Sequence, residues 1–308
     1  MLEVYNTSWR NTENTAVALG YFDGVHIAHQ ALISQMCSYA KENNLKKAVF
    51  TFTKTITLGH KGKDILTAGQ KLDVMRSLGI DLYYSPDFLE FASLTPEKFV
   101  KNILIDSMGA KAVFCGENFF FGKNRRGNVQ VLKQLCEKYN IVFIQAETVV
   151  LDGEVVSSTS IRNALADGNV EKAAVMLGRP YGVIFPVVHG KKIGRTIGTP
   201  TINQLYPSTM CSPKPGVYIT CTTVDGKRYP SATGLTNRPT VNGSGYTCET
   251  FILGFDGDLY HQNVQVEFHS FLFEAKKFDS LQQLGDMIYS SAVKAKEYLV
   301  EKGIGFEL

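Results

Sequence analysis

The chain has 308 residues, 44% of them hydrophobic, so it can bury a substantial core, and its length fits two domains as readily as one. Lys and Arg number 32 against 29 Asp and Glu, and a net charge of +3 excludes the concentrated basic field of a dedicated nucleic-acid-binding protein. No signal-peptide pattern or bilayer-length apolar stretch is present, so we expect a cytoplasmic protein that binds neither nucleic acid nor membrane.

From residue 15 to about residue 150, short runs rich in Val, Ile and Phe alternate with stretches of helical periodicity. The expected strands are 15–22, 47–52, 81–84, 112–116 and 141–148. Two apolar helical faces lie between them, one made of Leu32, Ile33, Met36, Cys37 and Ala40, the other of Phe99, Val100, Ile103 and Leu104. This alternation predicts an α/β domain with a parallel, doubly wound sheet.

After residues 178–180, the pattern changes to two-residue alternation between turn signals, with Val264, Val266 and Phe268 set against polar neighbours. This predicts an antiparallel sheet, most simply a β-barrel. A terminal helix should follow, with Ser280 as N-cap and Gln283 completing a capping box. Its apolar stripe is Leu281, Leu284, Ile288, Ala292, Ala295 and Leu299. We therefore expect two domains, 1–182 and 183–308.

The six cysteines are scattered along both halves of the chain. They form no CxxC pair and have no His nearby at zinc-site spacing. We expect reduced and mostly buried thiols, because cysteines of this kind usually pack in the core.

A first chemical segment, GYFDGVHIAHQ at 20–30, joins the first expected strand to the first helix. At such junctions, glycines let the backbone approach phosphate, and the helix N-terminus offers free amides. His26 and His29, three residues apart, can both donate hydrogen bonds to a departing pyrophosphate. Either histidine alone would be read as a cap or a surface residue, and zinc would lack a third ligand.

This segment resembles the HxGH motif of nucleotidylyltransferases in its FAD synthetase form, with Ala28 where that family usually has Gly. The resemblance implies a Rossmann-like domain that binds ATP. It implies that His26 and His29 are catalytic. It also implies an ATP site that includes Gly20, Phe22, Asp23 and Gly24.

Two later segments extend the resemblance. CGENFFFGK at 115–123 is similar to the family's GxNFxFG loop, which implies that Asn118 and Phe121 contact flavin. SSTSIR at 157–162 resembles the family's SSTxIR motif, which implies phosphate contacts from Ser158, Thr159 and Arg162 near a helix start. Ser160 stands where relatives commonly have Arg, so one positive charge is absent, and Lys123, Arg125 or Arg126 are candidates to replace it.

The run VHGKKIGRTIGTPTIN at 188–203 combines glycines, basic side chains and a PTxN ending. Glycines and cations together indicate phosphate binding, although such a loop alone is more often a solvated turn. The hydroxyl and amide of PTxN are suitable for holding Mg²⁺ and nucleotide.

This run resembles the flavokinase module of the bifunctional riboflavin kinase and FAD synthetase family, whose PTAN motif has Ala where this chain has Ile202. PGVY at 215–218, GLTNRPT at 234–240 and Glu249 follow in the family's order. The resemblance implies that Glu249 is the general base and that Thr201 and Asn203 coordinate Mg²⁺. It implies phosphate contacts from Gly190, Lys191, Gly194 and Arg195, and a flavin contact from Arg238.

The resemblance covers residues 19–298 and implies two activities, the phosphorylation of riboflavin to FMN and the adenylylation of FMN to FAD. ATP, riboflavin, FMN and FAD would be the partners, with Mg²⁺ accompanying ATP. Two alternatives stay open. In one, Ala28 and Ser160 have disabled adenylyl transfer and leave only a riboflavin kinase; in the other, the chain is a non-catalytic, flavin-binding regulatory protein.

Overall fold

The computed structural model describes residues 2–5, 10–52, 62–190, 193–240, 243–275 and 278–307. Its contacts divide the chain into two compact units, 1–61 with 67–157 and 62–66 with 158–308, and each is described by itself. This division groups the helices α6 (Ser158–Ala166) and α7 (Val170–Leu177) with the second unit. A functional boundary near residue 182 stays a prediction.

The first unit is built on a parallel sheet with the strand order β1-β4-β3-β2-β5-β6. The strands are β1 (Glu3–Tyr5), β2 (Thr15–Leu19), β3 (Lys46–Phe50), β4 (Leu82–Tyr84), β5 (Ala110–Cys115) and β6 (Val142–Gln145). All neighbours within it are parallel, which confirms the predicted sheet. The five predicted strands are present with shifted ends, whereas the edge strand β1 was not predicted.

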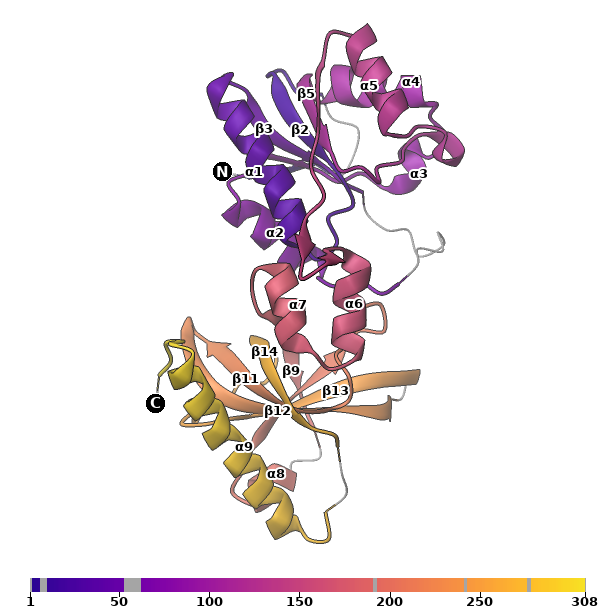
Figure 1. The fold of residues 1–308 in the computed structure, drawn as a ribbon. Helices are drawn as coiled ribbons and strands as arrows, with labels where there is room; N and C mark the ends of the chain where they lie inside the picture. The colour runs from indigo at the N-terminus through magenta and orange to yellow at the C-terminus, as the bar shows by residue number, and fades with distance from the viewer. Residues whose placement is uncertain are drawn as a thin grey trace. The chain divides into compact units, whose positions relative to one another are not determined.

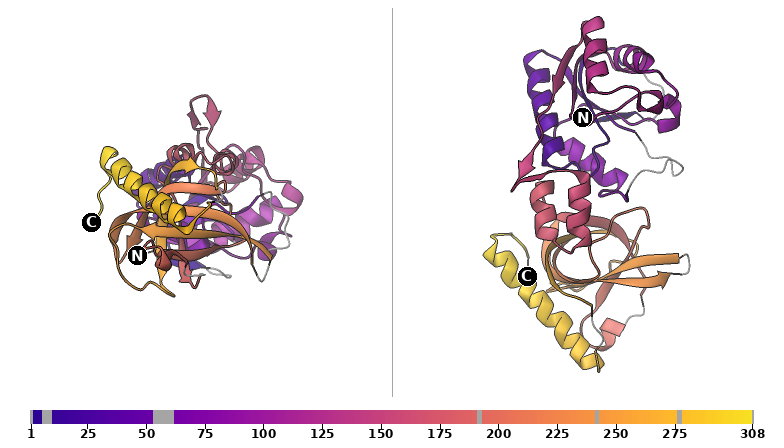
Figure 2. Two further views of the ribbon diagram at one scale, coloured as in Figure 1. Left: turned by 90° about the horizontal axis from the view of Figure 1, so that it is seen from below. Right: turned by 45° about the vertical axis from the view of Figure 1, so that its right-hand side comes forward.

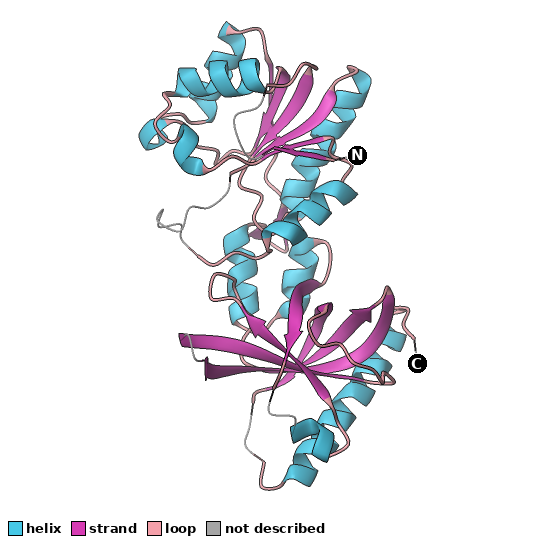
Figure 3. Ribbon diagram, turned by 180° about the vertical axis from the view of Figure 1, so that it is seen from behind, coloured by secondary structure: helices cyan, strands magenta, loops and turns pink. Residues whose placement is uncertain are grey.

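Helices cover both faces of this sheet (Figures 1 and 3). The helical elements are α1 (Ile27–Glu42), α2 (Ala68–Ser77), α3 (Phe88–Phe91), α4 (Pro96–Lys98), the π-helix η1 (Phe99–Ser107), the 3₁₀ turn η2 (Lys123–Arg125) and α5 (Val129–Lys138). A small hairpin, β7 (Val150–Leu151) with β8 (Glu154–Val155), follows. The predicted apolar faces of α1 and η1 are buried apart from Cys37 and Ile103, which are half-buried.

The central strand β2 is buried at every residue, as expected for a parallel strand covered on both faces. Its neighbours are β3 and β5. The segments that follow β2 and β5 therefore leave the same edge of the sheet, where ligands of open α/β sheets bind. This topology brings the segment at 20–30 and the segment at 115–123 to one edge.

The second unit contains the predicted antiparallel barrel, which is closed and has the strand order β10-β13-β12-β11-β14-β9. Its strands are β9 (Tyr181–Val188), β10 (Thr201–Tyr206), β11 (Gly216–Val224), β12 (Lys227–Thr240), β13 (Gly243–Ile252) and β14 (Asn263–Phe273), with the short helix α8 (Ile193–Thr196) before β10. Only two residue pairs join β9 to β10, Val188 with Asn203 and Val187 with Gln204. The buried Gln204 amide donates hydrogen bonds of 2.8 Å to carbonyls of both β9 and β14.

The terminal helix α9 (Leu281–Glu301) packs on β11, β12 and β13 and crosses the barrel diagonally (Figure 2). Ser280 caps it, because its hydroxyl accepts the Gln283 amide at 3.2 Å. The predicted capping box is incomplete, since the Gln283 side chain accepts from Asp279 N instead. The apolar stripe is buried at Ala292, Ala295 and Leu299, but Leu281 is 54% exposed, so the stripe starts later than predicted.

All six cysteines are free, and five of them are buried while Cys37 is half-buried. This confirms the expected thiols. Burial raises the pKa of Cys248, the neighbour of Glu249, to about 12, so this thiol stays protonated at neutral pH. Cys248 is therefore a packing residue rather than a nucleophile.

Candidate active sites

The turn between β2 and α1 has a strained backbone. Phe22 and Val25 have positive φ angles of 52° and 40°, which are uncommon for residues with a side chain. A Cβ at Gly20 would lie 2.9 Å from the ring of the buried Phe22, so glycine is needed for this packing. The Gln30 side chain donates to Val25 O at 2.8 Å and braces the end of the turn. Strain held in this way is typical of ligand-binding turns.

His26 and His29, the two predicted catalytic histidines, lie together at the start of α1. Their rings stack with centroids 3.6 Å apart. His26 is buried and is the N-cap of α1, because its Nδ1 accepts the His29 amide at 3.4 Å. Because Nδ1 accepts this amide, Nε2 is the ring nitrogen of His26 that can donate to an anion.

The environment of His29 favours its uncharged form. Desolvation by burial holds the pKa of His29 well below its ordinary value, and electrostatic effects of His26 and Lys71 lower this pKa further. Within the described residues, the buried His29 Nδ1 has no hydrogen-bond partner. Asp23, another predicted member of the site, is buried in the preceding turn, and Ala28 lies half-buried in the first turn of α1.

An aromatic cavity of about 360 Å³ lies in the first unit. Of the two predicted flavin contacts, Phe121 lines this cavity, whereas Asn118 is exposed and is not among the lining residues. The Arg125 guanidinium, also in the lining, lies 4.5 Å from the centroid of the Phe120 ring. The remaining lining residues are Phe50, Phe52, Phe88, Phe91, Ala92, Phe99, Phe119, Gly122 and Asn124. Such walls suit a flat, largely apolar ring system.

The SSTSIR segment begins helix α6, where Ser158, Thr159 and Arg162 lie in the first turns. The Arg162 guanidinium donates to Lys63 O at 2.8 Å. By contacts, this segment belongs to the second unit, whereas the two histidines belong to the first. That both segments hold one triphosphate stays a prediction.

The barrel brings together the three polar residues predicted for the kinase site. Asn203 pairs with Glu249 across β10 and β13, and Thr201 lies two residues before Asn203. Residues two apart share one face of a strand, so Thr201, Asn203 and Glu249 lie on one side of the barrel wall. On β12, Gly234 pairs with Glu249, and an added Cβ there would meet no atom closer than 3.9 Å, which leaves room beside the carboxylate.

The loop before β10 passes close to these residues. A Cβ at Gly190 would lie 2.6 Å from the Asn203 side chain, and one at Gly194 would lie 2.3 Å from Thr199 O. Glycine is therefore required at position 194, where the obstacle is backbone, whereas a side chain at position 190 would displace the Asn203 side chain. Lys191 lies outside the described residues, and so does the side chain of Arg238, whose backbone belongs to β12.

Hydroxyl, amide and carboxylate oxygens on one face form a donor set that suits Mg²⁺, which binds hard oxygen ligands. Thr201, Asn203 and Glu249 supply such a set. These residues therefore fit the predicted metal.

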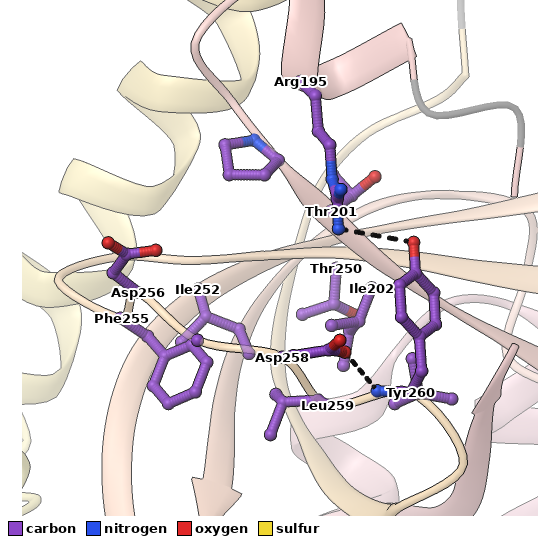
Figure 4. Close-up of a pocket in the computed structure, with 13 residues that line it drawn as sticks. Arg195, Thr201, Ile202, Thr250, Ile252, Phe255, Asp256, Asp258, Leu259 and Tyr260 are labelled. Carbon is purple, nitrogen blue, oxygen red and sulfur yellow. Dashed lines mark hydrogen bonds between the residues drawn. The ribbon is translucent and has the colours of Figure 1, made fainter. Parts of the chain in front are cut away.

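A cavity of about 390 Å³ lies beside Thr201 in the second unit (Figure 4). Arg195 extends into it, and its Nη2 donates to the Tyr260 hydroxyl at 3.5 Å. The Asp258 carboxylate accepts Tyr260 N at 2.9 Å. The other lining residues are Val187, Pro200, Ile202, Thr250, Ile252, Phe255, Asp256, Gly257 and Leu259. A cation, carboxylates and aromatic rings around one cavity suit the phosphates, ribose and base of a nucleotide.

Sequence reasoning missed several lining residues. In the loop 255–260, the sequence indicates only a turn at Asp-Gly-Asp. Phe88 and Phe91 are three residues apart, a helical spacing that is also typical of ordinary core residues. Sequence reasoning also did not single out Lys71, which lies with Met75 on the buried face of α2.

One further group of potential metal ligands, Cys221, Glu267 and His269, lies on β11 and β14. It already contains a cation, because Arg228 Nη2 donates to Glu267 Oε2 at 2.7 Å. Burial acts to raise the pKa of Glu267, but His269 and Arg228 outweigh it and lower this pKa. We therefore interpret this group as an ion-pair network of the barrel wall.

Residues 8–160 match the FAD synthetase family and residues 177–299 match the riboflavin kinase family. A bifunctional riboflavin kinase/FMN adenylyltransferase from Pseudomonas fluorescens is 34% identical over 284 residues, covering 90% of this chain and 91% of the relative. This chain belongs to the bifunctional riboflavin kinase and FAD synthetase family. A member from Escherichia coli K12 is 31% identical over 301 residues, covering 96% of each chain.

The fold of this chain is also found among solved structures. A Streptococcus pneumoniae crystal structure described as a macrolide-efflux protein superimposes with a TM-score of 0.86 and 29% identity, covering 96% of this chain and 98% of that one. In this chain, none of the described helices has the length and apolar character needed to span a bilayer.

Proposed function

We propose that the barrel unit phosphorylates riboflavin to FMN and that the parallel-sheet unit adenylylates FMN to FAD, both with ATP and Mg²⁺. The observation that carries this proposal is that each unit has its own cavity, one lined by Thr201 and Arg195 of the predicted kinase site and the other by Phe121 of the predicted flavin loop. Glu249 and the two histidines are not among the lining residues. Membership of a family with both modules supports the same division.

In the kinase reaction, Glu249 accepts the proton of the riboflavin 5′-hydroxyl as its oxygen attacks the γ-phosphorus of ATP. The bond between the γ-phosphorus and the β,γ-bridging oxygen breaks, and ADP leaves. Thr201 and Asn203 would hold Mg²⁺, which supplies charge neutralisation on the phosphates when bound. Arg195, which lines the cavity next to Thr201, binds the phosphates, and the loop with Gly190 and Gly194 covers them.

In the adenylylation reaction, a phosphate oxygen of FMN attacks the α-phosphorus of ATP in line with the departing pyrophosphate. One P–O bond forms and one breaks, without a covalent enzyme intermediate. His26 and His29 donate hydrogen bonds to the charge that develops on pyrophosphate. The aromatic cavity lined by Phe121 holds the isoalloxazine ring.

One assay tests this proposal. The purified chain is incubated with riboflavin, ATP and Mg²⁺, and the flavins are separated by chromatography over time. FMN that appears first and is then converted to FAD is the expected result. FMN alone would indicate a monofunctional kinase with a disabled adenylyl-transfer half. Tight riboflavin binding without any product would indicate a regulatory, non-catalytic protein.

A further inference from the structure

Lys71 is a buried lysine on helix α2 with a defined polar contact. It is only 8% exposed, and lysines are rarely buried unless a partner compensates their charge. Its Nζ donates to Tyr21 O at 3.0 Å and lies 4.4 Å from the centroid of the Tyr21 ring. The Thr51 hydroxyl, at the end of β3, donates to the same carbonyl at 3.1 Å. Side chains from α2 and from the end of β3 therefore hold the Tyr21 carbonyl in place.

The Tyr21 carbonyl belongs to the peptide that enters the strained turn before α1. The next residue, Phe22, already has a positive φ, and the turn ends at the cap residue His26. Backbone in such sparsely populated conformations persists only where the surroundings hold it. Lys71 is thus placed to hold the turn from its first peptide, while Gln30 braces its last residue through Val25 O.

The charge of Lys71 also acts on His29. Burial has the largest effect in lowering the pKa of His29, and electrostatic effects of His26 and then Lys71 lower it further. The acidic residue of the turn, Asp23, is buried in the same segment. A lysine ammonium near the N-terminus of α1 adds a permanent positive charge where helix amides already favour an anion.

We propose that Lys71 is a positioning residue of the adenylyl-transfer site, which holds the turn at 21–25 in its strained form and supplies a fixed positive charge beside His29. This inference rests on the adenylylation proposed above for the first unit. The fixed charge adds to the larger effect of burial in disfavouring protonation of His29, and it favours the phosphates of ATP over neutral ligands.

Three variants separate the two roles of Lys71. Lys71→Met removes both hydrogen bond and charge, Lys71→Gln keeps a donor without the charge, and Lys71→Arg keeps the charge. We expect FAD formation from FMN to fall on the order of 100-fold in K71M, as for the loss of one oriented donor in an active site. Riboflavin phosphorylation by the same molecules should stay unchanged. Lys111→Met, which removes an exposed lysine from β5, is the matched control and should change neither rate.

NMR titration of the histidine rings supplies a readout that a purely structural role would not move. The pKa of His29 should rise in K71M and K71Q, where a neighbouring positive charge is lost, and should stay low in K71R. If K71M does not fold, comparing K71Q with K71R still shows the effect of losing the positive charge on FAD formation and on the pKa of His29. An unchanged His29 pKa in K71Q, with FAD formation within about twofold of wild type, would overturn the inference.

These results are distinguishable from failure of the proposed function. If the wild-type chain makes FMN but no FAD, the adenylylation proposal fails on its own. The titration of His29 still decides whether Lys71 sets the charge state of this site, because it needs no turnover.

Discussion

Glu249 faces Thr201 and Asn203 from the adjacent strand, with open space on its other side at Gly234. A carboxylate with this placement can receive a proton from a hydroxyl bound beside the metal ligands. A substitution can therefore remove the basic carboxylate of Glu249 without changing the packing, because glutamine has the same shape but cannot accept the proton.

Replacing Glu249 with glutamine should lower FMN formation by about 100- to 10,000-fold, the usual contribution of a general base. FAD formation from added FMN should be unchanged. Both rates are measured by chromatography, and Glu297→Gln, an exposed site on α9, is the control. Parallel loss of both activities would contradict the assignment of Glu249 to the kinase alone.

His29 should also make stability depend on pH. Its folded pKa lies well below the unfolded value of about 6.5, so below that value the unfolded chain binds a proton that the folded chain refuses. The stabilising contribution is complete above about pH 6.5 and is lost as the pH falls toward the folded pKa. Urea unfolding between pH 7 and about pH 5 should show a steeper loss of stability for wild type than for His29→Asn. Equal slopes would count against a neutral, buried His29.

At the scale of elements, the loop between β9 and β10 depends on close backbone contacts at glycine. A methyl group at Gly194 would approach Thr199 O to 2.3 Å, so Gly194→Ala must displace the segment that carries Thr201. We expect the KM for ATP in riboflavin phosphorylation to rise about tenfold or more, since small misplacements of binding groups are costly. Gly305→Ala, with no atom within 4 Å, is the control. An unchanged KM would show that this loop does not position nucleotide.

Most elements could be predicted because their periodicity reports burial. The continuous apolar runs 16–19 in β2 and 112–115 in β5 are buried throughout and indicate strands covered on both faces. The alternation at 264–269 indicates a barrel wall. The edge strand β1 was missed because EVY is short, partly charged and exposed. The segment Phe99–Ser107 has the expected apolar face, but its π-helical backbone gives no distinct sequence signal.

The sites were predictable where ligand contacts come from glycines, histidines and hydroxyls in one continuous segment. The pairing of Asn203 with Glu249 joins residues distant in sequence and needed the barrel register to be seen. The aromatic cavity and Lys71 were missed for a different reason: phenylalanine and an amphipathic lysine also occur in ordinary cores, so only the fold distinguishes them.

At the scale of the whole molecule, two cavities in two separate units predict that the two reactions can be divided between molecules. A mixture of Glu249→Gln protein and protein with both His26 and His29 changed to Ala should convert riboflavin to FAD, although neither protein does so alone. FMN released by one variant then reaches the other through solution, and the lag before FAD appears should shorten as protein concentration rises. A mixture that accumulates FMN without FAD would contradict this independence.

The two residue pairs between β9 and β10 make this the shortest junction of the barrel, and it adjoins the loop that leads to Thr201. Local opening of the barrel should therefore start between β9 and β10, and the two hydrogen bonds of the Gln204 side chain limit it. Nucleotide binding at the adjoining loop would stabilise the pairing of β9 with β10. Hydrogen–deuterium exchange of the backbone amides should then slow most at Val188 and Asn203 when ATP is added. The exchange rate at this junction would then report whether nucleotide is bound to the barrel.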